Sequence, residues 1–119
     1  MSGILSFVVA GVGGSSLDVT ANDVTRTQSG FAGSGTVTTI QVPTPLVVGG
    51  MAPYTYLWAR TSGSTAPVVS SATAENPTWS ATVTDGAAEI ATWELTVTDD
   101  SAATATVSIL VSLNWFNFS

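Results

Sequence analysis

The sequence predicts an all-β fold, an antiparallel β-sandwich of about seven short strands. From Gly35 onward, apolar residues alternate with Thr and Ser, and turn-forming Gly, Pro, Asn and Asp interrupt the alternation about every 8–12 residues. No stretch keeps the 3.6-residue apolar repeat of an amphipathic helix, whereas Thr and Val, which favour strands, are abundant. With 119 residues, the chain is long enough to bury the core of one domain without disulfides or metal.

The first part of the chain differs from the rest. We expect residues 1–34 to form an N-terminal arm or extended segment ahead of a domain at residues 35–119. The apolar stretch Ile4–Val9 precedes a glycine-rich run, and a polar part follows with one short strand at Leu17–Thr20. The arm is either a flexible terminus or an apolar strand that the domain or a neighbouring subunit covers. In the second case, the residues expected to contact a partner are Ile4, Leu5, Phe7 and Val8.

The rest of the sequence predicts the strands of the sandwich in order. Pro43 and Pro45 confine the strand beside them to an edge or a bend, and turns are expected at Thr61–Ser64, Asp85-Gly86 and Asp99–Ser101. We expect strands at Thr36–Val42, Pro45–Gly49, Pro53–Arg60, Pro67–Ser71, Thr78–Thr84 and Ile90–Thr98, and a last strand from about Ala105 to Leu113. The alternation assigns these residues to the core: Trp58, Trp79, Trp93, Leu95, Val97, Val107, Ile109 and Val111.

The composition excludes several classes of function. Only 8% of the residues are charged, the net charge is −6, and Arg26 and Arg60 are the only cationic side chains, so the chain lacks the cations that bind nucleic acid or anionic membranes. Without His or Cys it has neither the usual general base nor a thiol nucleophile, and we expect no enzyme and no cofactor. The longest apolar run, Ile4–Val12, is shorter than the roughly 20 residues that span a bilayer, and it lacks the basic flank of a signal peptide. We therefore expect the protein to stay in the cytoplasm where it is made.

Two motifs resemble those of a known family. The run Gly49–Trp58, with the sequence GGMAPYTYLW, resembles the G-G-x-x-P-Y-T-Y-x-W motif of immunoglobulin-like domains of the polycystic-kidney-disease (PKD) type. Residues Trp93–Val107, with the sequence WELTVTDDSAATATV, resemble the last hairpin of that family. The resemblance covers about Thr36–Leu113 and implies an immunoglobulin-like sandwich.

The chain departs from the family pattern at two places. Ala102 or Ala103 replaces the Gly of the hairpin, and Leu95 stands where many relatives carry a Cys, so no inter-sheet disulfide can form. Small stand-alone proteins with both motifs are similar to accessory proteins encoded among bacteriophage structural genes. The resemblance implies a non-enzymatic virion protein that is assembled in the host cytoplasm and binds capsid or tail proteins, as a homo-oligomer or in multiple copies. Capsid and tail remain open, and the alternative is a tail-fibre or adhesin module that binds carbohydrate or protein on the host surface.

Three carboxylates are the candidates for a metal site, although we expect a protein that is stable without metal. Asp85, Asp99 and Asp100 could supply oxygen ligands to calcium if they converged at one end of the sandwich. No EF-hand or repeat spacing supports this arrangement.

The C-terminus is unusually aromatic for a chain end, which is normally polar and frayed. Trp115, Phe116 and Phe118 lie beyond the expected end of the last strand and are candidates for partner contact, since buried aromatic rings dominate many interfaces. Alternatively, Trp115 and Phe118 close the open end of their own sandwich.

Overall fold

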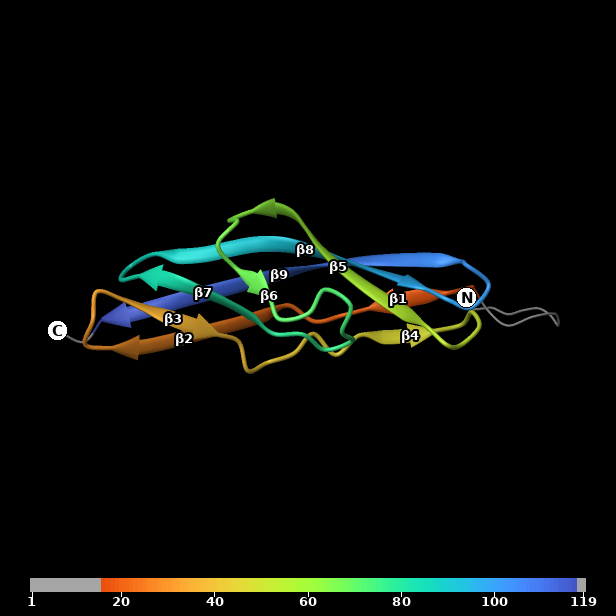
Figure 1. Cartoon of the computed structure of the whole chain (residues 1–119), viewed down its shortest axis with the longest axis horizontal. Coiled ribbons are helices and arrows are strands. Elements are labelled where there is room, and N and C mark those ends of the chain that lie inside the picture. The colour runs from red at the N-terminus through yellow and green to blue at the C-terminus, as the bar shows by residue number, and fades with distance from the viewer. Residues whose placement is uncertain (1–15, 118–119) are drawn as a thin grey trace, which may run out of the picture.

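A computed structural model describes residues 16–117 of the chain. Within that range the chain forms nine β-strands and no helix, arranged as an elongated sandwich (Figure 1). The strands are β1 (Asp18–Thr20), β2 (Val24–Gly30), β3 (Ser34–Thr38), β4 (Leu46–Val48), β5 (Thr55–Gly63), β6 (Val68–Val69), β7 (Trp79–Thr84), β8 (Ala88–Thr98) and β9 (Thr104–Asn117). The all-β sandwich predicted from the sequence is confirmed.

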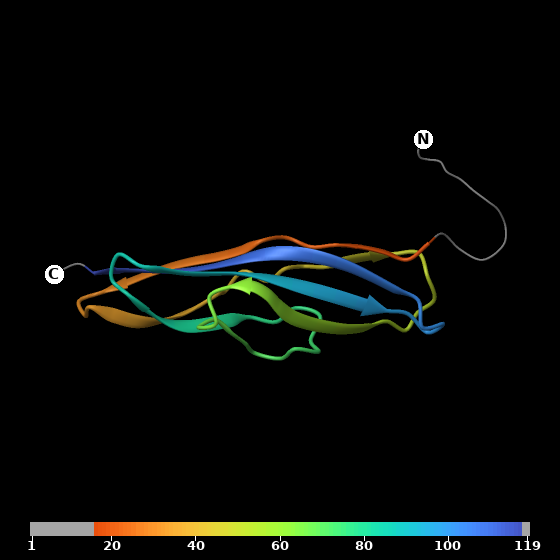
Figure 2. The same cartoon turned by 90° about the horizontal axis from the view of Figure 1, so that it is seen from above.

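The strands of the described residues form three hydrogen-bonded sheets. One sheet has the strand order β2-β9-β8-β5, and a second has the order β3-β7-β6. Figure 2 shows β2 and β9 on one side of the molecule and β3 and β7 on the other. The third sheet is the antiparallel pair of β1 and β4, which lies at the end of the molecule far from the last residues of β9 (Figure 1).

Strand β8 shows how alternation in the sequence becomes a buried face. Successive side chains of a strand point to opposite faces, so apolar residues at every second position lie together. Ala91, Trp93, Leu95 and Val97 are buried in this way, while the residues between them are partly exposed. β8 is central in its sheet, with β5 and β9 antiparallel on its two sides.

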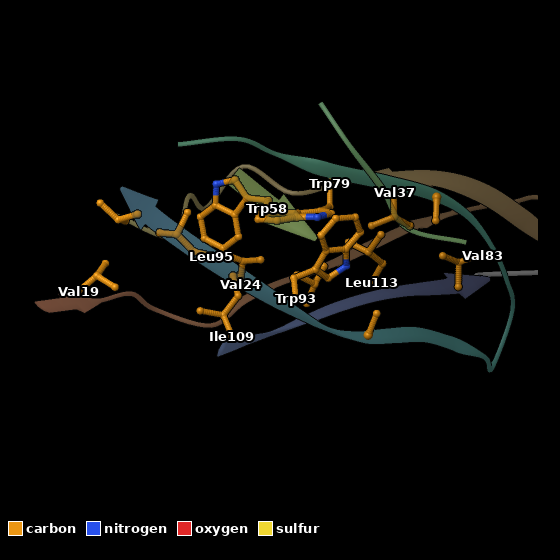
Figure 3. Close-up of a cluster of buried hydrophobic side chains, with 14 residues drawn as sticks. Val19, Val24, Val37, Trp58, Trp79, Val83, Trp93, Leu95, Ile109 and Leu113 are labelled. Carbon is orange, nitrogen blue, oxygen red and sulfur yellow. The ribbon is translucent and has the colours of Figure 1, made fainter. Parts of the chain in front are cut away.

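Three tryptophans fill the middle of the core (Figure 3). The ring of Trp79 is edge-on to Trp58 at a centroid distance of 5.3 Å and to Trp93 at 5.7 Å, an arrangement that aromatic rings prefer to face-to-face stacking. Trp58 and Trp93 come from the four-stranded sheet and Trp79 from the opposite one, so the rings join the two layers. Of the core positions assigned from the sequence, all are buried except Val107, which is partly buried against the core.

The chain enters the sandwich earlier than the sequence indicated. Part of the arm expected at residues 1–34 belongs to the domain, because β1 pairs with β4 and β2 pairs with β9 along its whole length. Val19 and Val24 are buried in the core. The arm was therefore wrongly extended to residue 34, and residues 1–15 lie outside the described residues.

Three further features differ from the expectation. The pair β2–β9 is parallel, whereas the sequence predicted an antiparallel sandwich. β5 continues to Gly63 through a bulge between Arg60 and Ser62, where a turn was expected. β9 runs to Asn117 instead of ending near Leu113, because β2 pairs with it up to that residue.

Candidate functional site

The residues predicted to contact a partner fall into two groups. Trp115 and Phe116 lie at the end of β9, beside the loop that joins β2 to β3. We call this part of the molecule the aromatic end, defined by Phe31, Trp115 and Phe116. The remaining partner candidates lie outside the described residues: Ile4, Leu5, Phe7, Val8 and Phe118.

Trp115 packs against its own domain. Its indole Nε1 donates a hydrogen bond to the carbonyl oxygen of Ala32 at 2.9 Å. The ring lies over Gly30 and Gly35, where a Cβ atom at Gly30 would come within 2.8 Å of Trp115 Cη2 and one at Gly35 would overlap the ring outright. Glycine at both positions thus makes room for the indole. Of the two alternatives for Trp115, contact with a partner or closure of its own sandwich, this packing corresponds to closure.

Phe116 and Phe31 present their rings to solvent at the same end. Phe116 is 57% exposed and pairs in register with Ser29, two residues before Phe31, which is 82% exposed. Phe31 was not among the candidates from the sequence. The sequence could have indicated it, because a large apolar residue between Gly30 and Gly33 is unusual in a short loop.

Asp85 helps to fix the aromatic end. Its Oδ1 accepts a hydrogen bond from the backbone N–H of Asn117 at 2.9 Å, and its own N–H donates to the carbonyl of Gly33 at 2.8 Å. The β7–β8 turn therefore holds both the C-terminal end of β9 and the β2–β3 loop. The exposed rings of Phe31 and Phe116 therefore lie on segments that hydrogen bonds hold together: the β2–β3 loop, the end of β9 and the β7–β8 turn.

Asp99 organises the opposite end of the sandwich. It is only 6% exposed, and its Oδ1 accepts hydrogen bonds from the hydroxyl and the backbone N–H of Ser101 and from the N–H of Ala103. Its Oδ2 accepts from the N–H of Met51 at 3.0 Å, so the carboxylate ties the β8–β9 hairpin to the β4–β5 loop. Gly50 has a φ of 69°, and a Cβ there would lie 2.7 Å from Asp99 Oδ2, so this close approach requires glycine.

These hydrogen bonds also set the acidity of Asp99. The hydroxyl of Ser101, followed by the N–H groups of Met51, Ala103 and Ser101, lowers the pKa of Asp99 below its ordinary value, because all of them stabilise the ionised carboxylate. Burial acts in the opposite direction without reversing the shift. Asp99 is thus a structural carboxylate that is charged at neutral pH.

The three candidate calcium ligands do not come together. Asp85 precedes β8 and Asp99 and Asp100 follow it, so the 11 residues of the strand separate them by roughly 35 Å at 3.3 Å per residue. Both oxygens of Asp99 already accept hydrogen bonds from the protein. The described part of the chain contains no group of three or more His, Cys, Asp or Glu residues that could hold a metal ion. The hypothesis that Asp85, Asp99 and Asp100 converge on a calcium ion at one end of the sandwich is therefore wrong.

A hydrogen-bonded pair, Ser64 and Glu89, lies beside the end of β5. The hydroxyl of Ser64 donates to the carboxylate of Glu89 and accepts from the N–H of Ala66, so this pair braces the chain after β5. Residues 16–117 contain no helix that is long and apolar enough to cross a membrane.

Comparison with known proteins identifies the fold. No protein-family profile and no curated protein matches the sequence significantly. The chain is similar to the solution structure of the PKD domain (329–428) from human KIAA0319, with 14% identity, a TM-score of 0.51 and coverage of 96% of each chain. It is also similar to the solution structure of the PKD domain from the KIAA 1837 protein, with 14% identity, a TM-score of 0.46 and coverage of 93% of this chain and 94% of that chain. The fold is a PKD-type, immunoglobulin-like β-sandwich.

Proposed function

We propose that this protein is a non-enzymatic structural accessory protein of a bacteriophage virion, which decorates the capsid or the tail in several copies. In this proposal it is assembled onto the particle in the host cytoplasm and docks on a capsid or tail protein through the aromatic end. The observation that carries the docking surface is the exposure of Phe31 and Phe116 on a braced part of the sandwich.

The physical argument rests on exposure and rigidity together. Two large rings that are 82% and 57% exposed lose apolar surface to a partner when they dock, which is the main favourable term in association. Because Trp115 and Asp85 fix the segments beneath them, little conformational entropy is lost on binding. The low charge of the chain, with 8% charged residues and no Lys, also favours contact with protein over contact with nucleic acid.

The first test is where the protein resides. An antibody against this chain should label intact particles purified from the phage-producing cells, and negative-stain images would assign the label to the capsid or the tail. Particles that carry no label would contradict the proposal.

The second test is whether the aromatic end does the docking. Phe31→Ser combined with Phe116→Ser should lower incorporation into particles by about tenfold or more while leaving the melting temperature of the purified protein near that of the parent. Leu57→Ser is the matched control, because Leu57 is 54% exposed but lies on the outer face of the four-stranded sheet. Incorporation of the double variant at the level of the parent would exclude the aromatic end as the docking surface.

A second candidate function is the binding of host-surface carbohydrate. It is favoured by rows of hydroxyl groups across the outer face of the four-stranded sheet, where Thr98 pairs with both Thr55 and Thr104, and Thr96 pairs with Thr106. Aligned hydroxyls on neighbouring strands are donors and acceptors for sugar hydroxyls. Binding of the purified protein to host-cell glycans, lost in Thr104→Val with Thr106→Val, would support this function over decoration.

A further inference from the structure

The sheet edges of the sandwich are not protected equally. Gln28 Oε1 accepts the N–H of Thr38 at 3.0 Å, and Gln41 Oε1 accepts the N–H of Thr25 at 3.3 Å, so side chains occupy backbone donors of β3 and β2. On the edge of β5, the N–H of Trp58 donates to the carbonyl of Ala72 at 2.8 Å. These contacts reduce the capacity of the edges to pair with another chain.

β4 differs from these three edges. Within residues 16–117 it pairs with β1 alone, so its second edge has no strand beside it. Leu46 is 62% exposed and Val48 is 46% exposed, and both point away from the core while Val47 packs against it. We call Leu46, Val48 and this edge the β4 surface. An exposed apolar edge strand favours pairing with a further strand.

The chain itself contains a segment of matching chemistry. Ile4–Val9 precedes the described residues and has no charged side chain, as is also true of β4. As an extended strand it would present Leu5, Phe7 and Val9 on one face and Ile4 and Val8 on the other. If the backbone of such a strand paired with β4, the apolar side chains of one face would lie beside Leu46 and Val48 and contact them.

We propose that Ile4–Val9 of one copy of this protein adds as a strand to the β4 surface of a second copy. This inference deepens the proposed function, on which its biological role rests, because it names a second copy of the chain as a partner. The contact lies at the end of the elongated molecule opposite the aromatic end (Figure 1), so both contacts are available at once.

The connection to β1 argues for a second copy over the same chain. β1 runs antiparallel to β4 and begins at Asp18, opposite Val48, and only residues 10–17 separate it from Val9. If the segment of the same chain ran parallel to β1, these eight residues would have to form a crossover, which takes about a dozen or more. If it ran antiparallel to β1, they would have to cross the β4–β5 connection at the same edge, which protein chains avoid. A second copy meets neither restriction.

The test is the oligomeric state of the purified full chain, measured by light scattering over a range of concentrations. We expect the parent to self-associate, and Leu5→Asp with Phe7→Asp, or Leu46→Asp with Val48→Asp, to be monomeric. Leu57→Asp with Leu110→Asp is the control, since it places two charges on exposed apolar positions of the other sheet and should associate like the parent. Melting curves establish that each variant is folded.

Mixing the two monomeric variants separates docking between copies from docking within one chain. Each variant retains one intact partner surface, so an equimolar mixture should form heterodimers if the segment docks on another copy. A mixture that stays monomeric, a parent that is monomeric at all concentrations, or association that survives the β4 substitutions would each overturn the inference. None of these measurements involves the virion, so their failure is distinct from a failure of incorporation through Phe31 and Phe116.

Discussion

At the scale of single residues, the three core tryptophans play different parts. The Nε1 of Trp58 donates to the carbonyl of Ala74 at 2.9 Å, whereas the buried Nε1 atoms of Trp79 and Trp93 have no hydrogen-bond partner among residues 16–117. A buried donor without a partner carries a desolvation cost, so these two indoles contribute to stability through their volume and ring contacts. Trp58 adds a polar link to the loop between β6 and β7.

Replacing Trp58 by Ala should lower the free energy of unfolding by about 3–5 kcal/mol, because it leaves a large cavity and an unpaired carbonyl at Ala74. Leu57→Ala is the matched control on the adjacent, outward position and should cost less than about 1 kcal/mol. Urea unfolding followed by far-UV circular dichroism measures both. Equal losses in the two variants would show that Trp58 does not carry the core.

The second residue-scale prediction concerns acid. Because hydrogen bonds hold the pKa of Asp99 below its ordinary value in the folded chain, its contribution to stability is fully present above the unfolded-state pKa and is lost as the pH falls through the folded-state pKa. Asp99→Asn has one acceptor oxygen in place of two and should be less stable than the parent at neutral pH, with a difference that shrinks in acid. Thermal melts between pH 7 and pH 2 test this, with Asp100→Asn as the exposed neighbouring control. A difference that stays constant over this range would contradict the role of the carboxylate charge.

At the scale of elements, the sequence predicted strands wherever one face is apolar. β7 and β8 were found because Trp79, Ala81 and Val83, and then Trp93, Leu95 and Val97, occupy every second position. β2 was missed because Arg26 and Gln28 follow Val24 at its partly buried positions, so the strand carries no apolar alternation. Pairing with β9 stabilises β2 through backbone hydrogen bonds, which a single sequence does not reveal.

The candidate site was predictable to the same extent. Trp115 and Phe116 could be named because aromatic residues near a chain end are unusual, but the slot over Gly30 and Gly35 depends on which strands become neighbours. The separation of the carboxylates, in contrast, could be read from the sequence. The strand expected at Ile90–Thr98 lies between the turns that carry Asp85 and Asp99, which places these turns at opposite ends of one strand, as β8 shows.

The slot for Trp115 gives an element-scale prediction with a built-in control. Gly35→Ala places a Cβ inside the Trp115 ring and should lower stability by about 1–3 kcal/mol, as overpacking does. Gly33→Ala, two residues earlier, meets no atom within 4 Å and should change stability by less than about 0.5 kcal/mol. Melting curves of the two variants decide the matter, and a Gly35→Ala protein as stable as Gly33→Ala would show that the ring does not occupy this slot.

At the scale of the whole molecule, the fold is closed by pairing between the beginning and the end of the described chain. β2 lies beside β9 over seven residues, from Val24 opposite Val111 to Gly30 opposite Asn117. β1 closes the other end by pairing with β4. The first two strands therefore each complete a sheet, β1 beside β4 and β2 beside β9.

This closure predicts that a chain cut at the boundary suggested by the sequence will not be a stable domain. A protein of residues 35–119 lacks Val19 and Val24 from the core, leaves β4 without a paired strand and leaves β9 paired with β8 alone. Its Trp115 also loses Gly30 and the carbonyl of Ala32. We expect it to unfold without a cooperative transition, whereas residues 16–119 should melt like the monomeric full chain. Circular dichroism and tryptophan fluorescence during heating compare the two proteins directly. Cooperative melting of residues 35–119 within a few degrees of residues 16–119 would mean that β1 and β2 are accessory, because the loss of two core valines and of every β2–β9 hydrogen bond should cost most of the about 5–15 kcal/mol that stabilises a domain of this size.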